Sequence, residues 1–190
     1  LIFTSGINIY ILLAIFIAGA SLLTYLIIYV PRFDYIQGRI FSFFNRETGT
    51  HNFQSDKAIE SITSGGFFGK GIGEGVLKNR VPEAHTDYII SVISEEFGVV
   101  AIMLILLLFL ILIYMVFKKI SFETNDKVKL ILIGSISLIL MQATIHVGVN
   151  IRLFPTTGMT LPFLSYGGSS IISTSILAGI ILNLTKRKIT

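Results

Sequence analysis

The sequence has 190 residues, of which 53% are hydrophobic and 14% are charged, and its formal net charge is +4. A soluble domain is typically about 25% charged, so this chain has too few polar residues to cover a water-exposed surface. It has no cysteine, which excludes disulfides and thiolate metal sites. The basic residues form no cluster of the kind that binds nucleic acid. The composition therefore indicates an integral membrane protein.

Four stretches of the sequence contain no Asp, Glu, Lys or Arg, and each exceeds the roughly 20 residues that a helix needs to cross a bilayer. They are residues 1–31, 97–117, 130–151 and 153–185. From these stretches we predict transmembrane helices at residues 7–30, 88–117, 129–150 and 162–185. The predicted fold class is an all-α polytopic membrane bundle, and we expect residues 1–190 to form part of one membrane domain.

The basic residues that flank the spans predict their orientation. Short loops and tails rich in Lys and Arg stay in the cytoplasm. The loop 118–129 and the tail 186–188 carry such residues, and two spans separate them. The long polar segment 31–87 is therefore predicted to lie outside, although it carries basic residues of its own.

The long segment contains two patterns of its own. Residues 53–62, FQSDKAIESI, have apolar residues at helical spacing and predict an amphipathic helix on the membrane or on the protein. The glycine loop, SGGFFGKGIGEG at residues 64–75, follows it. Such loops bring backbone N–H groups close to phosphates, but this pattern matches neither the P-loop nor a dinucleotide fingerprint. Two interpretations remain, a tight re-entrant turn and a backbone cradle for a pyrophosphate.

The segment VPEAHTDYIISVISEEFGVV, residues 81–100, gathers titratable residues just before a predicted span. Thr86 is the predicted N-cap of that helix, which places Asp87 in the first turn at the membrane boundary. The helix dipole alone favours an Asp there, so a capping role and a catalytic role are both open. On a continuous helix Glu95 lies about 12 Å from Asp87 along the axis, too far for a glycosidase pair. We expect Glu95 and Glu96 to hold neighbouring helices or backbone through hydrogen bonds.

Motifs for metal binding and nucleophilic catalysis are missing from the sequence. His85 and Asp87 supply only two ligands and no HExxH occurs, so no metal site is predicted. The composition leaves a Ser–His–Asp triad open, but no GxSxG nucleophile elbow is present. His146, in the third span, is expected to form an interhelical hydrogen bond. The segment PTTGMTLPFLSYGGSS, residues 155–170, predicts either close helix packing or broken backbone that lines a polar cavity.

Three segments, in this order, resemble the SEDS family of bacterial cell-wall polymerases, FtsW, RodA and SpoVE. They are SGGFFGKGIGEG, VPEAHTDYIISVISEEFG and NIRLFPTTGMTLPFLSYGGSS. The resemblance covers nearly the whole chain and is closest to the cell-division member FtsW. One departure is DYIISVI at residues 87–93, which keeps the acid and an aromatic residue but not the usual family pattern after them. Family members have more transmembrane helices than the four predicted here, so we expect the chain to be a C-terminal portion.

SEDS proteins polymerise lipid II, an undecaprenyl-pyrophosphate-linked disaccharide pentapeptide, into glycan strands. The resemblance implies that Asp87 is the general base, which takes the proton of the acceptor sugar's 4-hydroxyl as undecaprenyl pyrophosphate leaves with inversion. The pyrophosphate needs positive charge, which a divalent cation (Mg²⁺ or Mn²⁺) or basic residues would supply. The alternative interpretation of these basic residues is that they are ordinary solvated charges of a loop. The candidate substrate-contacting residues are Lys70, Lys78, Arg80, Glu83, His85, Thr86, Ser165, Tyr166, Gly167, Gly168, Ser169 and Ser170.

The resemblance also implies partners and a location. We expect a class B penicillin-binding protein transpeptidase as partner, together with other division proteins, in the bacterial inner membrane at the division septum. Two alternatives of other classes remain, a lipid II flippase and a non-catalytic scaffold of the division machinery. Transport favours titratable groups near the membrane midplane, whereas an acid at the outer surface, Asp87, favours the enzyme.

Overall fold

The computed structural model describes residues 8–44, 50–81 and 83–186, and every regular element in these ranges is a helix. The side chains of residues 50–52 and 78 are outside the description. The chain forms two compact units, Leu1–Asn52 and Phe53–Thr190. The all-α prediction is confirmed. Whether residues 1–190 form one membrane domain stays a prediction.

The first unit contains the first predicted span. Helix α1 (Ile9–Tyr29) begins after Asn8, whose side chain accepts a hydrogen bond from the N–H of Tyr10 at 3.0 Å. It ends before Pro31, which opens the 3-10 turn η2 (Pro31–Phe33), and α2 (Asp34–Phe44) follows. No residue of α1 is buried within the structure, and its side chains are apolar on all sides. Such a helix suits a lipid environment.

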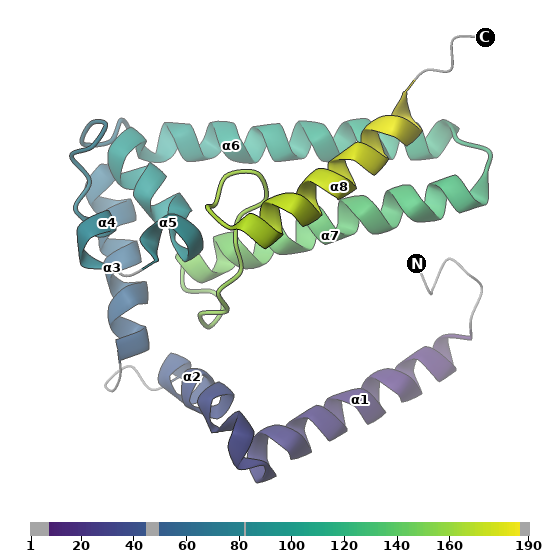
Figure 1. Cartoon of the computed structure of the whole chain (residues 1–190), viewed down its shortest axis with the longest axis horizontal. Helices are drawn as coiled ribbons and strands as arrows, with labels where there is room; N and C mark the ends of the chain where they lie inside the picture. The colour runs from purple at the N-terminus through teal and green to yellow at the C-terminus, as the bar shows by residue number, and fades with distance from the viewer. Residues whose placement is uncertain (1–7, 45–49, 82, 187–190) are drawn as a thin grey trace. The chain divides into compact units, whose positions relative to one another are not determined.

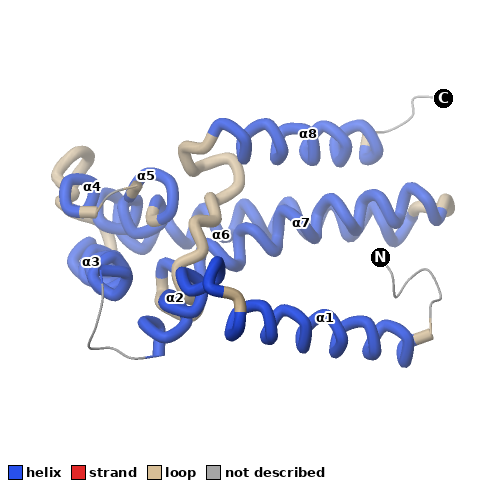
Figure 2. Tube along the Cα trace, turned by 60° about the horizontal axis from the view of Figure 1, so that its bottom comes forward, coloured by secondary structure: helices blue, strands red, loops and turns tan. Residues whose placement is uncertain are grey.

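The second unit holds the other three spans, and Figures 1 and 2 show them side by side. They are α6 (Ile89–Phe122), α7 (Asp126–Asn150) and α8 (Gly168–Thr185). Helix α7 packs between the other two and shares with them a core that includes Val116, Leu132, Ile136, Ile139 and Ile181. Four described helices, α1 among them, are long and apolar enough to cross a membrane, which confirms the predicted spans.

The fourth span differs from its prediction at its start. The sequence predicts a helix from residue 162, but α8 begins at Gly168. Residues 151–167, here called the 151–167 loop, fold instead as an irregular segment with turns at 151–154 and 162–165. Phe163 has a φ of 66° and Gly158 a φ of 71°. Because these values are incompatible with a right-handed helix, the apolar run 161–166 does not continue α8 toward its N-terminus.

The described part of residues 50–87, within the predicted extramembrane segment, forms three helices, α3 (Thr50–Gly65), α4 (Leu77–Arg80) and α5 (Ala84–Asp87), which lie almost entirely in the second unit. They enclose a small core of Ala58, Leu77, Val81, Ala84, Tyr88 and Val149. The amphipathic helix predicted over residues 53–62 lies within α3. Ala58 is fully buried against the protein, whereas Phe53 at the start of that helix is 51% exposed.

Helix α6 is interrupted at Gly98, whose φ of 79° and ψ of 178° lie outside the helical region. The two N–H groups that follow this break cannot reach the helical carbonyls behind it, and they donate to the glycine loop instead. The two bonds run from Val99 N to Gly66 O at 3.0 Å and from Val100 N to Phe67 O at 3.3 Å. A Cβ at position 98 would lie 2.2 Å from the carbonyl oxygen of Phe67, so only glycine fits.

The helical carbonyls before the break are also occupied by the glycine loop. The two bonds run from Lys70 N to Glu95 O at 2.9 Å and from Gly71 N to Glu96 O at 3.1 Å. The loop therefore replaces two helical hydrogen bonds on both sides of the interruption. This favours the interpretation of the loop as a packed turn, because two N–H groups that a pyrophosphate cradle would need are already used.

Candidate functional site

Asp87 is the last residue of the short helix α5, and α6 begins two residues later at Ile89. The intervening Tyr88 is buried and has a φ of −123° and a ψ of 28°, so the two helices are not continuous. The prediction that Thr86 caps the membrane helix is wrong. Its hydroxyl donates to the carbonyl oxygen of Glu83 at 2.8 Å, within α5. Because Asp87 and Glu95 lie on different helices, the separation of about 12 Å expected for one straight helix does not apply to them.

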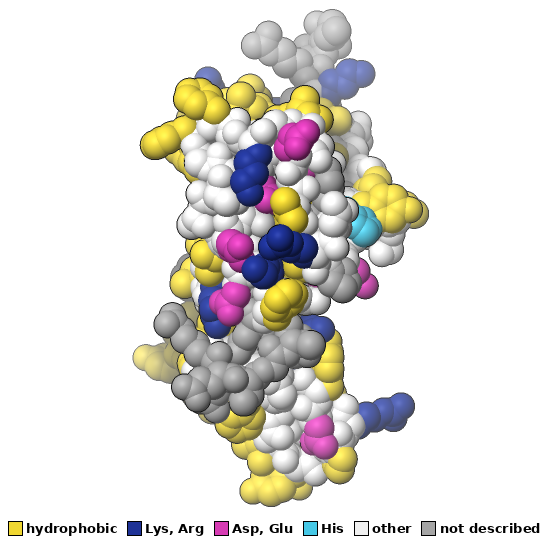
Figure 3. All heavy atoms as spheres, turned by 90° about the vertical axis from the view of Figure 1, so that its left-hand side faces the viewer, with side chains coloured by type: hydrophobic (Ala, Val, Ile, Leu, Met, Phe, Trp, Pro, Cys, Tyr) yellow, Lys and Arg dark blue, Asp and Glu magenta, His cyan; other side chains and the backbone are white. Residues whose placement is uncertain are grey.

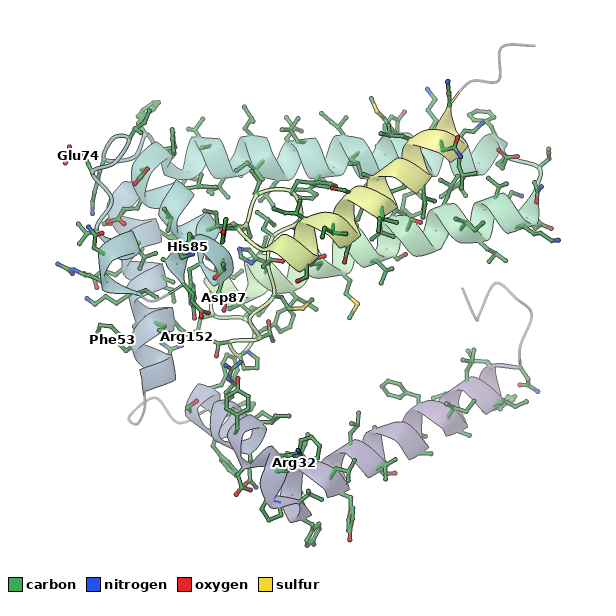
Figure 4. The ribbon with its side chains drawn as sticks, in the orientation of Figure 1. Arg32, Phe53, Glu74, His85, Asp87 and Arg152 are labelled. Carbon is green, nitrogen blue, oxygen red and sulfur yellow. The ribbon has the colours of Figure 1, made fainter. Side chains whose placement is uncertain are left out.

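The Asp87 carboxylate is half-buried and faces the 151–167 loop. A Cβ at Gly158 would lie 3.6 Å from Oδ2 of Asp87, so this glycine passes directly beside the acid. Figure 4 shows Asp87 and His85 on the same short helix at the end of the spans. The acid thus lies just before a membrane-spanning helix and next to the backbone of Gly158.

The 151–167 loop is fastened to α5 by backbone contacts. Ser165 donates its hydroxyl to the carbonyl oxygen of Thr86 at 2.7 Å and accepts the N–H of Leu161 at 2.8 Å. The N–H of Tyr166 donates to the carbonyl oxygen of His85 at 3.2 Å. The rings of His85 and Tyr166 lie 5.7 Å apart between centroids. Two segments that the sequence singled out separately therefore meet at one place.

Three polar residues of α7 bond to the 151–167 loop or to α5, and they are Gln142, His146 and Asn150. Because they are spaced four apart, they share one face of the helix. Gln142 donates to the hydroxyls of Thr160 and Ser170 at 3.1 and 3.0 Å. Sequence reasoning noted His146 but missed the other two. The spacing in QATIHVGVN was the signal that could have revealed them.

His146 and Asn150 reach opposite sides of the Asp87 site. His146 is fully buried, and its Nδ1 donates to the carbonyl oxygen of Met159 at 2.7 Å, in the 151–167 loop rather than in another helix. Asn150, also fully buried, donates to the carbonyl oxygen of Asp87 at 3.1 Å and to that of His146 at 2.9 Å. Its Oδ1 accepts the N–H and the hydroxyl of Ser91 at 3.2 and 2.8 Å.

Glu95 is buried and forms an ion pair with Lys70, with Nζ and Oε1 2.9 Å apart. Its other oxygen accepts the N–H of Leu77 at 2.9 Å. Gly75 lies against both glutamates, since a Cβ there would be 2.9 Å from Cγ of Glu96 and 3.3 Å from Oε2 of Glu95. Glu95 therefore ties the glycine loop and α4 to the start of α6.

A polar cavity of about 180 Å³ opens between α3, the glycine loop, α4 and α6. Its polar lining residues are Lys57, Glu60, Ser61, Ser64, Lys70, Arg80 and Glu95, and Asp87 is not among them. Figure 3 shows charged side chains of both signs close together on this end of the molecule. The hydrogen bond and charge of Lys57 hold the pKa of Glu60 below its ordinary value, and the charges of Arg80 and Lys70 lower it further.

The remaining candidates differ in position. Glu83 and Ser169 are exposed, and Ser170 is bonded to Gln142 and to Thr160. Gly167 and Gly168 form the start of α8. Lys78 lies in α4, but its side chain is outside the described part of the chain. The substrate contact predicted for each of these residues stays a prediction.

A divalent cation held by protein side chains alone would need a set of acidic or imidazole ligands, whereas one held largely by a substrate's phosphates would not. Among the residues that the structure describes, no three His, Cys, Asp or Glu side chains lie close enough together to hold one. The described side chains alone therefore do not fit a protein-held metal, and no chemical step at this site is derived through one.

Comparisons with known proteins show the family of this chain. The model of the cell cycle protein family FtsW/RodA/SpoVE matches residues 1–189. The chain belongs to this family. A "Probable peptidoglycan glycosyltransferase FtsW" of Enterococcus hirae is 39% identical over 138 residues, which cover 72% of this chain and 35% of that protein. The relative of the same description in Caulobacter vibrioides is 38% identical over 158 residues, 82% of this chain and 40% of that protein.

A further relative and a solved structure extend the match. The "Probable peptidoglycan glycosyltransferase FtsW" of Geobacter metallireducens is 36% identical over 177 residues, 90% of this chain and 47% of that protein. The solved structure is described as "Structural coordination of polymerization and crosslinking by a peptidoglycan synthase complex". It matches with a TM-score of 0.69 and 27% identity, over 93% of this chain and 48% of that chain. The chain thus spans less than half the length of these relatives.

Proposed function

We propose that this protein is a peptidoglycan glycosyltransferase that polymerises lipid II during bacterial cell division, with Asp87 as its general base. The observation that carries the proposal is the place of Asp87, a half-buried carboxylate at the entrance of the spanning helix α6, beside the backbone of Gly158. The relatives of the same family are named as probable peptidoglycan glycosyltransferases.

The place of the acid suits a lipid-linked sugar substrate. The tails of such a substrate lie in the bilayer and its sugars in the water outside, so the reacting atoms meet at the boundary. Asp87 removes the proton from the acceptor's 4-hydroxyl while that oxygen bonds to the anomeric carbon of the donor. The bond from that carbon to the pyrophosphate oxygen breaks, the electron pair leaves with undecaprenyl pyrophosphate, and the configuration inverts. One base suffices because pyrophosphate is a good leaving group.

The groups around Asp87 are proposed to bind and orient the substrate, and no second acid or base is proposed among them. Gly158 lies next to the carboxylate, and the exposed rings of His85 and Tyr166 lie together on the segments that α5 and the 151–167 loop contribute. Lys70 and Arg80 are the proposed contacts for the pyrophosphate, with a divalent cation as the second source of positive charge. Lys70 already pairs with Glu95, so Arg80 is the stronger of the two candidates.

The distribution of ionisable residues argues against a transporter. In the described spans α6, α7 and α8, Asp, Glu, Lys, Arg and His occur only near the helix ends. Coupled transport favours such groups near the membrane midplane. The proposal further places Asp87 on the extracytoplasmic side of the inner membrane at the septum. It includes a class B penicillin-binding protein as partner, because the structural relative is a peptidoglycan synthase complex.

The test is polymerisation of purified lipid II by the full-length protein with its partner, comparing wild type with Asp87→Asn. Asn keeps the shape of the side chain but cannot take a proton. We expect polymerisation to fall by at least about a hundredfold, with unchanged thermal unfolding and partner binding. Retained polymerisation would leave Asp87 a structural residue and would refute the proposed mechanism.

A further inference from the structure

At the start of α6, a side chain of α7 takes the place of the helical hydrogen bond between Ser91 and Asp87. In a continuous helix the N–H of Ser91 would donate to the carbonyl oxygen of Asp87. Here the Ser91 N–H donates to Oδ1 of Asn150 at 3.2 Å, and Nδ2 of Asn150 donates to Asp87 O at 3.1 Å. The amide of Asn150 is therefore inserted between the donor and the acceptor of one helical bond, so that α5 turns away from the line of α6.

The orientation of this amide is fixed by its other contacts. The hydroxyl of Ser91 donates to Oδ1 at 2.8 Å, and Nδ2 also donates to the carbonyl oxygen of His146 at 2.9 Å. With donors on one side and acceptors on the other, the amide has a single favourable orientation. Asn150 is fully buried, so water does not compete for these bonds.

The same helix also holds the opposite wall of the site. His146, one turn earlier in α7, donates to the carbonyl oxygen of Met159 at 2.7 Å. Met159 is the neighbour of Gly158, the residue beside the Asp87 carboxylate. Helix α7 thus fixes the acid through Asn150 and the facing loop through His146.

We infer that Asn150 is a positioning residue for Asp87: its amide keeps α5 bent away from α6 so that the carboxylate points at the substrate beside Gly158. This inference rests on the proposed function and adds to it a residue that touches no reacting atom. Removing the amide lets Ser91 N–H and Asp87 O bond to each other directly. Such a rearrangement satisfies both backbone groups, so the fold survives while the carboxylate turns to a new direction.

Neither Leu nor Asp at position 150 can bridge the Ser91 N–H and the Asp87 carbonyl as the Asn amide does. Leu has the same branched arrangement of heavy atoms as Asn but no polar atoms, and Asp lacks the N–H that reaches the Asp87 carbonyl. Ser91→Ala is the matched partner variant, because it removes the hydroxyl contact and keeps the bridge from Asp87 O to Ser91 N. Thr144→Val is the control on the same helix, since it removes a hydrogen bond to Leu140 O at 2.8 Å away from Asp87.

The experiment measures kcat, KM and thermal unfolding with purified lipid II, using the full-length protein in complex with its partner. We expect Asn150→Leu to lower kcat by about 10- to 100-fold while KM stays within about twofold, since no substrate contact is lost. Ser91→Ala should keep kcat within about threefold of wild type, and Thr144→Val should match wild type. If Asn150→Leu does not fold, Asn150→Ala, which is smaller and cannot clash, carries the same expectation.

Two results would overturn the inference. One is wild-type kcat in folded Asn150→Leu, and the other is an equal loss in Asn150→Leu and Ser91→Ala that follows their loss of folded protein. Asp87→Asn, measured alongside, separates this failure from that of the proposed function. If Asp87→Asn polymerises like wild type, the catalytic role fails, whereas a silent Asn150 with an essential Asp87 removes only the positioning role.

Discussion

Asn150 donates a hydrogen bond from its side-chain amide to the main-chain carbonyl of Asp87, at 3.1 Å, across 63 positions of the sequence. The contact links the end of one membrane helix to the acid that precedes another. The contact therefore holds the backbone of Asp87 rather than its carboxylate. Four further consequences of the structure can be measured.

Gly158 should be intolerant of a side chain. Its φ is 71°, and a Cβ there would lie 3.6 Å from Oδ2 of Asp87. Gly158→Ala is expected to cost about 1–2 kcal/mol of stability through backbone strain and to lower kcat/KM by crowding the substrate side of the acid. The measurements are thermal unfolding and lipid II polymerisation. Gly179→Ala is the control, because it lies in α8 with nothing within 4 Å and should match or exceed wild-type stability.

The glycine at the break of α6 should matter more than a neighbouring loop glycine. Gly98→Ala places a Cβ 2.2 Å from the carbonyl oxygen of Phe67, so it should cost about 3 kcal/mol or more and displace the glycine loop. Gly66→Ala shares the positive φ, 57°, but has nothing within 4 Å, so it should cost about 1–2 kcal/mol. Equal melting temperatures for the two variants would show that the loop does not hold the break.

Lys70 and Arg80 are both proposed to contact pyrophosphate. Their substitution should affect different measurements, stability for Lys70 and KM for Arg80. Lys70→Met leaves the buried Glu95 carboxylate without its ion pair, so it should destabilise the protein by about 3 kcal/mol. Arg80→Gln should leave the melting temperature unchanged and raise KM for lipid II by about three- to tenfold. Wild-type KM in Arg80→Gln would remove that residue from the substrate site. The double variant shows whether the effects add.

Glu60 should give helix α3 a stability that is lost in acid. The hydrogen bond and charge of Lys57 hold the pKa of Glu60 below its ordinary value of 4.5. Because the folded-state pKa is the lower one, the contribution is fully present above pH 4.5 and disappears as the pH falls through the folded-state value. Glu60→Gln should reduce the fall in melting temperature over that acid range, and Lys57→Met should do the same. A Glu60→Gln curve parallel to wild type would contradict the linkage.

The positions of the spans could be predicted from the sequence because they depend on local composition. Long runs without charge must be helices in lipid, since every backbone polar group there needs a partner within its own segment. The same runs predict that Asp87 lies at a membrane boundary, and this stays a prediction. Family motifs then pointed to the acid, to the glycine loop and to the segment 155–170.

The details of the site depended on contacts that no local pattern encodes. Thr86 looked like a helix cap, yet α6 starts at Ile89 because Tyr88 is drawn into the small core and Asn150 takes the place of a helical bond. The start of α8 moved to Gly168 because the 151–167 loop is bonded to α5 and α7.

The sequence alone therefore determined the fold class, the four spans and the residue types near the acid. Only the tertiary structure decided the direction of Asp87, the partner of Glu95 and the use of the glycine loop to complete the break at Gly98. The physical reason is that hydropathy is summed over neighbouring residues, whereas a broken helix keeps its shape only if distant segments satisfy the backbone groups that the break leaves open.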